Sequence, residues 1–210
     1  MKSQEYQKLI NQINAKGSQK FQGYSNDLLL DIPVSEREEA EQLIWNTYYE
    51  KKDVSILVLF PFLLKYDGIR ALEDIIKDCK IPSDASMSIS LILYERTEDN
   101  KYLQIAEKNI IEAGYNYSFI ASATRLKPDK QVYDMFVKIY KACKEETALS
   151  TCIRGLLYNA GFLRDIHDFT QISQEKELIN IMKNAPISGR DLMIQKLENG
   201  EFDKYNIFKS

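Results

Sequence analysis

The stretch LLKYDG at residues 63–68 recurs in altered form as LILYER at 91–96, TRLKPD at 124–129 and LLYNAG at 156–161. Each of the four places an apolar run before a turn. The residue that marks the end of the run recurs at spacings of 28, 32 and 32 residues, at Tyr66, Tyr94, Leu126 and Tyr158. A recurrence of about thirty residues is the length of two short helices with their turns, which is typical of arrays of helical hairpins.

Apolar positions with helical spacing follow each of the first three turns. They are Leu72, Ile75, Ile76 and Cys79 in the first repeat; Leu103, Ala106 and Ile110, widened by Ile111 and Ala113, in the second; and Val132, Met135, Phe136, Ile139 and Cys143 in the third. Residues three and four apart share one face of a helix. Each stripe is too wide to be left in water and too short to fold alone, so the sequence predicts that neighbouring repeats cover one another.

In this period and apolar pattern the chain resembles the HEAT-like α-solenoid families over residues 53–170. The resemblance implies an all-α fold in which stacked helical hairpins form a short solenoid. We expect a single domain over residues 1–210, with N-terminal helices and a loop at 1–52, repeats at 53–170, and C-terminal helices with a capping tail at 171–210. The alternative is an irregular helical bundle whose hairpins are similar by accident.

Capping signals predict the helix boundaries outside the repeats. A first helix is expected over residues 1–16, closed by Gly17, and an irregular segment over 18–33. Ser35 with Glu38 has the spacing of a capping box and would open a helix that runs to about Lys51. The tail carries three aromatic residues spaced by three and would dock over the last apolar face. The remaining predictions are Asp53 as the cap of an apolar helix broken by Pro61, helices at 173–183 and 188–198, and a tail anchored by Phe202, Tyr205 and Phe208.

Composition limits the classes of function. Hydrophobic residues make up 44% and charged residues 28% of the 210, which is ordinary for a folded domain. The net charge is −3 and no run is dense in Lys or Arg, so a nucleic-acid partner is not expected. No signal segment and no apolar run of membrane-spanning length is present, and three widely spaced cysteines indicate reduced thiols. These features predict a cytoplasmic protein without a membrane partner, and the abundance of Lys, Ile, Asn and Tyr fits an AT-rich bacterial genome.

The sequence holds no motif of a catalytic, cofactor or metal site. It lacks a glycine-rich phosphate loop, a nucleophile elbow, an HExxH and a CxxC. The single histidine, His167, lies between Asp165 and Asp168, but no nucleophile or second ligand accompanies it at a suitable spacing. We therefore expect no cofactor and no enzyme activity, and we interpret His167 as a structural hydrogen-bonding residue.

Acidic and aromatic residues predict a partner-binding surface. Carboxylates would attract a basic protein, and tyrosines offer a large contact area at low entropic cost. The candidate residues are Glu38, Glu39, Glu41, Tyr49, Asp74, Asp78, Tyr115, Tyr117, Asp134 and Asp168. The most concrete hypothesis is a small immunity protein that neutralises a basic toxin such as a nuclease by covering its active site.

Two other functions fit the same pattern. A HEAT-like DNA glycosylase would use a carboxylate and an aromatic side chain on an extruded base, in the roles of Asp165 or Asp168 and of Tyr158. A general scaffold would bind several partners instead of one. Failure to bind duplex DNA at low salt would exclude the glycosylase, and the number of partners distinguishes a scaffold from an immunity protein.

Overall fold

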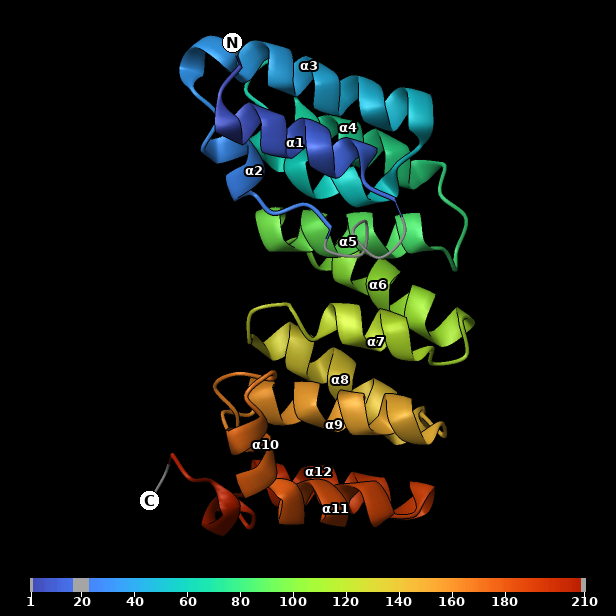
Figure 1. Cartoon of the computed structure of the whole chain (residues 1–210). Coiled ribbons are helices and arrows are strands. Elements are labelled where there is room, and N and C mark those ends of the chain that lie inside the picture. The colour runs from blue at the N-terminus through green and yellow to red at the C-terminus, as the bar shows by residue number, and fades with distance from the viewer. Residues whose placement is uncertain (1, 17–22, 209–210) are drawn as a thin grey trace. The chain divides into compact units, whose positions relative to one another are not determined.

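The computed structural model describes residues 2–16 and 23–208, which form helices joined by turns and loops, with no strand among them (Figure 1). The all-α prediction is thereby confirmed. The chain divides into two compact units, unit 1 at residues 1–98 and unit 2 at residues 99–210. The division falls inside the region predicted to hold the repeats.

Unit 1 is built around an apolar 3₁₀ segment, η2. Its helices are α1 (Gln4–Asn14), α2 (Asp27–Leu30), α3 (Val34–Lys51), η2 (Val54–Phe62), α4 (Gly68–Lys77) and α5 (Asp84–Thr97). Ile56, Leu57, Leu59 and Phe60 are fully buried, because η2 contacts α2, α3, α4 and α5. Burial of the apolar run is as predicted, whereas an α-helix divided at Pro61 is wrong: the run is 3₁₀ throughout.

Two local signals set the boundaries of η2 and α4. Asp53 caps η2, as predicted, because its side chain accepts a hydrogen bond from the Ser55 amide. α4 begins at Gly68, where an added Cβ would lie 1.9 Å from the carbonyl oxygen of Phe60. Only glycine permits this approach of α4 to η2.

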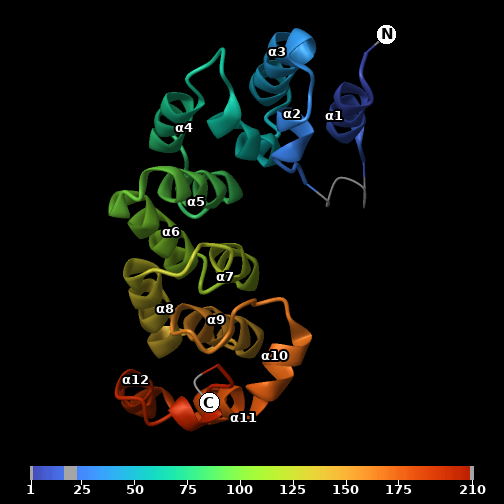
Figure 2. The same ribbon diagram turned by 90° about the vertical axis from the view of Figure 1, so that its left-hand side faces the viewer.

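The predicted capping box at the start of α3 is wrong. The helix begins at Val34 with Pro33 as its N-cap, so Ser35 already lies inside it. The nearby Glu36 has a partner distant in sequence instead: its carboxylate accepts from the Ser3 amide at 3.1 Å and from the Ser3 hydroxyl at 2.6 Å. These bonds connect the start of α1 to α3, as the neighbouring ribbons in Figure 2 show.

Unit 2 arranges its longer helices in two sets of contacts. Its elements are α6 (Asn100–Glu112), α7 (Tyr117–Ala123), α8 (Lys130–Ala142), α9 (Glu146–Asn159), α10 (Phe169–Gln174), α11 (Lys176–Asn184), η3 (Ile187–Gly189), α12 (Arg190–Glu198) and η4 (Asp203–Tyr205). α8 contacts α6 and α12, while α9 contacts α7 and α11. α8 and α9 also pack on each other, and Gly155 permits this because a Cβ there would lie 2.7 Å from the ring of Phe136.

The predicted apolar stripes are confirmed in part. All five positions on α8 and its C-cap are buried, as are Leu103, Ala106 and Ile110 on α6. Ile111 is exposed, because it lies about 100° around the helix from Ile110 and thus leaves the buried face. In the stripe that begins on α4, Leu72 is fully buried, whereas Ile75, Ile76 and Cys79 are half-buried.

The terminal predictions have mixed outcomes. The helix expected at 173–183 is divided between α10 and α11, and the one expected at 188–198 is η3 followed by α12. In the tail, Phe202 is buried and Phe208 lies 4.2 Å from the guanidinium of Arg164, which supports docking of the tail on unit 2. Gly17 lies outside the described residues, and the segment expected to be irregular up to residue 33 contains α2.

Candidate functional site

A buried ion pair in unit 1 fixes the loop that follows η2. The side chain of Glu41 is only 1% exposed and accepts from the Arg37 Nε at 3.0 Å. Its second carboxylate oxygen accepts from the backbone amides of Leu64 at 2.9 Å and Lys65 at 2.7 Å. Arg37 also donates to the carbonyl oxygens of Leu29 and Phe62. α2, the start of α3 and the end of η2 are therefore joined at one point.

Three large apolar side chains are exposed around this ion pair. Val34 is 93% exposed, Leu64 83% and Leu30 52%. Leu30 follows one carbonyl that Arg37 binds, Leu64 follows the other by two residues, and Val34 lies three residues before Arg37 on α3. We call these three side chains the Leu64 patch. Because the loop is tied through two backbone amides, Leu64 is held outward by a rigid support.

The predicted acidic residues of α3 lie beside this patch, and they are paired. Glu38 binds Lys65 at 2.8 Å, and Glu39 binds Lys2 and accepts from the Tyr6 hydroxyl at 3.2 Å. These hydrogen bonds lower the pKa of both carboxyls below the ordinary value. Glu38 and Glu39 are thus exposed to solvent but are neutralised locally. The prediction that Glu41 binds a partner is wrong, because its side chain is buried and bonded within unit 1.

Of the aromatic residues near the end of α3, Tyr49 is accessible to a partner and Trp45 belongs to the packed interior. Trp45 stacks on Tyr66 at 4.4 Å and on Phe60 at 5.4 Å between ring centroids, which makes it part of the packing of unit 1. Tyr49 is 42% exposed and contacts the Trp45 ring at 4.9 Å. The ammonium group of Lys52 lies 5.5 Å from the Tyr49 ring, so this aromatic face already has a cation over it.

The other predicted residues lie on separate elements of the two units. In unit 1, Asp74 is exposed and paired with Lys77 at 2.7 Å, and Asp78 is the exposed C-cap of α4. In unit 2, Tyr117 is the half-exposed first residue of α7, and Tyr115 occupies the preceding turn with φ of +64°. Asp134 pairs with Lys130 at 2.6 Å. Of the predicted residues, Glu38 lies beside the Leu64 patch, because it follows Val34 by one helical turn and binds Lys65.

The region around His167 is a capped turn. The His167 amide donates to an Asp165 oxygen at 2.7 Å. Asp168 is the N-cap of α10 and accepts from the amides of Thr170 at 2.8 Å and Gln171 at 3.2 Å, which lowers its pKa. Both carboxylates therefore accept hydrogen bonds from backbone amides within three residues of them.

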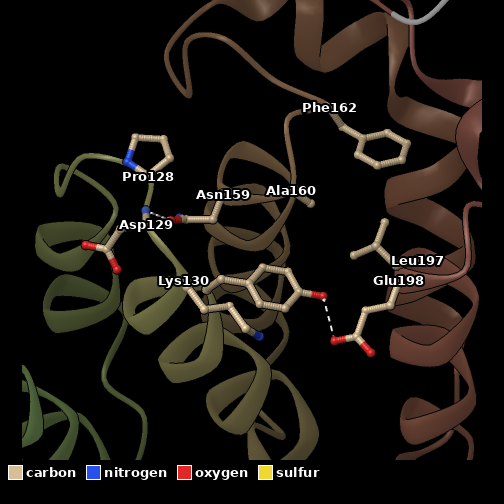
Figure 3. A pocket seen from close by; sticks show the side chains of 9 residues that line it. Pro128, Asp129, Lys130, Asn159, Ala160, Phe162, Leu197 and Glu198 are labelled. Atoms are coloured by element: carbon tan, nitrogen blue, oxygen red, sulfur yellow. Dashed lines mark hydrogen bonds between the residues drawn. The ribbon is translucent and has the colours of Figure 1, made fainter.

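A pocket in unit 2 was missed by the sequence reasoning. It has a volume of about 520 Å³ and is lined by the start of α8, the end of α9 and the end of α12. Figure 3 shows Phe162, Leu197 and Glu198 on one side and Pro128 and Asp129 on the other. The Tyr133 hydroxyl donates to Glu198 at 3.3 Å, across 65 residues of sequence. No local pattern indicates a pocket made from such distant segments.

Hydrogen bonds hold the mouth of this pocket in place. The Asp129 amide donates to the Asn159 side-chain oxygen at 3.2 Å, and the Asn159 amide group donates to the Gly155 carbonyl at 2.8 Å. Burial and the Glu198 carboxylate raise the pKa of Tyr133, because both disfavour its phenolate. The Tyr133 hydroxyl is therefore a stable donor at neutral pH.

The described residues contain no group of three or more His, Cys, Asp or Glu side chains placed to hold a metal ion. The three cysteines are free, and Cys143 and Cys152 are buried. Within the same part of the chain, no helix combines the length and the apolar character needed to cross a bilayer.

Comparison of the chain with family models, with curated proteins and with solved structures finds no match.

Proposed function

We propose that this protein is a protein-binding module that docks a basic partner on the Leu64 patch of unit 1. The observation that carries the proposal is the outward position of Leu64, 83% exposed and fixed by the buried carboxylate of Glu41. A leucine on a mobile loop needs no explanation. A leucine whose backbone amide is bound to a buried ion pair is pre-organised, and this reduces the entropy lost on binding.

Charge supports a basic partner. Residues 1–98 carry sixteen Asp and Glu against twelve Lys and Arg, whereas residues 99–210 carry fifteen against sixteen. The negative balance of the chain therefore resides in unit 1, where the patch lies. A basic protein would be attracted to unit 1 over a distance and then held by apolar contact.

The repeat architecture belongs to the same proposal. In unit 2, α6, α8 and α12 contact in one series and α7, α9 and α11 in another, which supports stacked hairpins of the HEAT-like kind. Arrays of this kind commonly present surfaces to other proteins. The most concrete version of the function is an immunity protein that binds and neutralises a basic toxin such as a nuclease.

The test is a matched pair of substitutions. Leu64→Asp places a charge in the patch, and Leu192→Asp places one at a half-exposed leucine of α12 in unit 2. Both positions face solvent, so both variants are expected to fold. The tagged wild-type protein and both variants would be used to capture partners from the native cell, and the captured protein would be purified for calorimetry.

We expect a basic partner whose affinity falls by at least about tenfold, or 1.4 kcal/mol, in Leu64→Asp and stays within twofold in Leu192→Asp. A toxin activity in the partner that the wild-type protein inhibits would establish the immunity role. An acidic partner, or equal affinities of the two variants for the partner, would contradict the proposal. So would a capture experiment in which Leu64→Asp retains every protein that the wild-type protein captures.

A further inference from the structure

A buried carboxylate in unit 2 lacks a counter-charge. Glu175 lies where α10 ends and α11 begins, and its side chain is fully buried. Its Oε2 atom has no hydrogen-bond partner among the described residues, and its Oε1 atom accepts from the backbone amide of Ile207 at 3.4 Å. A charged carboxylate is rarely buried without a cation and several hydrogen bonds, such as Glu41 has in unit 1. The surroundings of Glu175 therefore suit a neutral acid.

Glu175 occupies the N-cap position of α11 without capping the helix. A side chain at this position usually accepts from the free amides of the first turn, which favours a charged carboxylate. Glu145 does so at the start of α9, where hydrogen bonds from the amides of Ala148 and Thr147 lower its pKa. The Glu175 side chain makes no such bond to α11. The start of this helix therefore does not stabilise the charge of Glu175 through hydrogen bonds.

The C-terminal tail closes over this carboxylate. Asn206 is buried, and its side-chain amide donates to the Gly161 carbonyl at 3.2 Å. The Phe208 amide donates to the Asn206 side chain at 2.9 Å, and its ring lies 4.2 Å from the guanidinium of Arg164. The residue between these two donates the bond to the buried carboxylate. A few contacts of residues 206–208 thus hold the tail on the α10–α11 junction.

Charged groups on the surrounding elements do not compensate Glu175. Burial is the main cause that raises its pKa, the Ile207 amide acts in the opposite direction, and no charged side chain among the described residues contributes. The charged side chains that flank it on the turn after α9, on α10, on α11 and in the tail are exposed or half-buried: Arg164, Asp168, Lys176, Glu177, Asp203 and Lys204. Exposure to water is therefore the route by which Glu175 can carry a charge.

We propose that residues 206–208 form a strap that is closed over the α10–α11 junction while Glu175 holds a proton and that opens when Glu175 ionises. The neutral acid can stay buried under the strap, whereas the carboxylate, having released its proton to solvent, requires hydration. Opening of the strap supplies that water. Closure is thus most favourable below the ordinary pKa of 4.5, and it weakens as the pH rises towards the raised pKa of the closed protein.

Hydrogen exchange of the full chain, followed by ¹H–¹⁵N spectra between about pH 4 and pH 8, measures this opening. The amides of Ile207 and Phe208 report on the strap, and the amide of Ile139, on the buried face of α8, reports on unfolding of unit 2. Dividing each rate by the intrinsic rate at the same pH gives a protection factor. We expect the strap amides to be at least about tenfold less protected than Ile139 at every pH. Their protection should fall by about tenfold per pH unit above 4.5 and level off above the raised pKa.

A matched pair of variants assigns the pH dependence to one carboxyl. Glu175→Gln keeps the shape of the neutral acid at every pH, so its strap should show the same protection throughout and more than the wild-type protein at neutral pH. Glu177→Gln makes the same change at an exposed glutamate that also contacts the tail, where it accepts from the Tyr205 hydroxyl at 3.3 Å. This control should retain the pH dependence of the wild-type strap.

Three results would overturn the proposal. Equal protection of the strap amides and of Ile139 would mean that the tail opens only when unit 2 unfolds. Protection of the wild-type strap that does not change with pH would remove the switch, and this result needs no variant. A pH dependence that persists in Glu175→Gln would assign the effect to another group.

Discussion

Arg190 is expected to be the most sensitive charged residue of unit 2. Its side chain is buried, and one terminal nitrogen donates to the carbonyl oxygens of Tyr140 and Cys143, both at 2.6 Å. These carbonyls lie in the last turn and at the C-cap of α8, where they lack intrahelical partners. Arg190 begins α12, so it both caps α8 and connects the two helices.

The cost of removing this side chain follows from its contacts. A hydrogen bond from a charged donor contributes about 1.5–3 kcal/mol, and Arg190→Ala removes two and leaves two buried carbonyls unpaired. The substitution also removes a buried positive charge, and the Arg190 Nε has no hydrogen-bond partner among the described residues. Removing that charge offsets part of the lost stability. We therefore expect a loss of about 3–4 kcal/mol in the free energy of unfolding of unit 2.

Urea denaturation followed by two probes would measure it. Far-ultraviolet circular dichroism reports on the helices of the whole chain, whereas fluorescence of Trp45, the single tryptophan, reports on unit 1. Arg125→Ala, at an exposed arginine of unit 2, is the control and should change the stability by less than about 0.5 kcal/mol. A loss below about 1 kcal/mol in Arg190→Ala would refute the capping role.

Three further substitutions test other parts of the structure by circular dichroism during urea denaturation. Gly68→Ala should destabilise unit 1 by more than about 3 kcal/mol, because the added Cβ would meet the backbone oxygen of Phe60 rather than a movable side chain. A variant as stable as the wild-type protein would contradict the close contact between α4 and η2. Glu41→Ala should cost about 3–5 kcal/mol, since it leaves the Arg37 charge and two backbone amides without their acceptor, and a cost near zero would refute the stabilising role of these Glu41 contacts. Glu175 is fully buried and burial raises its pKa above 4.5, so its ionisation destabilises the fold as pH rises through the raised value. Glu175→Gln should therefore be the more stable protein at neutral pH, by about 1.4 kcal/mol for every tenfold by which folding weakens the acidity of Glu175, and the difference should shrink in acid. A stability difference that does not depend on pH would be contrary evidence.

The sequence predicts features of this fold that depend on neighbours within a turn or two. The cap at Asp53 and the buried stripe of α8 are of this kind, because an N-cap and a helical face involve residues close in sequence. The capping box failed because α3 begins at Val34, one residue before Ser35, and because Glu38 binds Lys65, 27 residues away. Such a partner leaves no local trace.

The candidate sites depend even more on distant contacts. The sequence analysis places Glu38 and Glu41 on one partner-binding surface, but the structure separates Glu41, buried under the loop at Leu64, from the exposed Glu38. The bond from Tyr133 to Glu198 joins helices that no spacing rule relates. Predicting either site requires knowledge of which helices pack together.

Local pairing of the acidic residues has a kinetic consequence for partner binding. Glu38 and Glu39 already bind Lys65 and Lys2, so they offer few new ion pairs in a complex. The negative balance of unit 1 still acts over distance, where salt screens it with a Debye length of about 10 Å at 0.1 M. We therefore expect salt to lower the association rate with a basic partner and to change the dissociation rate little. Leu64→Ala should do the opposite, raising the dissociation rate at unchanged association rate, as surface plasmon resonance with the purified partner would measure. If the dissociation rate rises steeply with salt and Leu64→Ala leaves it unchanged, ion pairs hold the complex and the Leu64 patch does not.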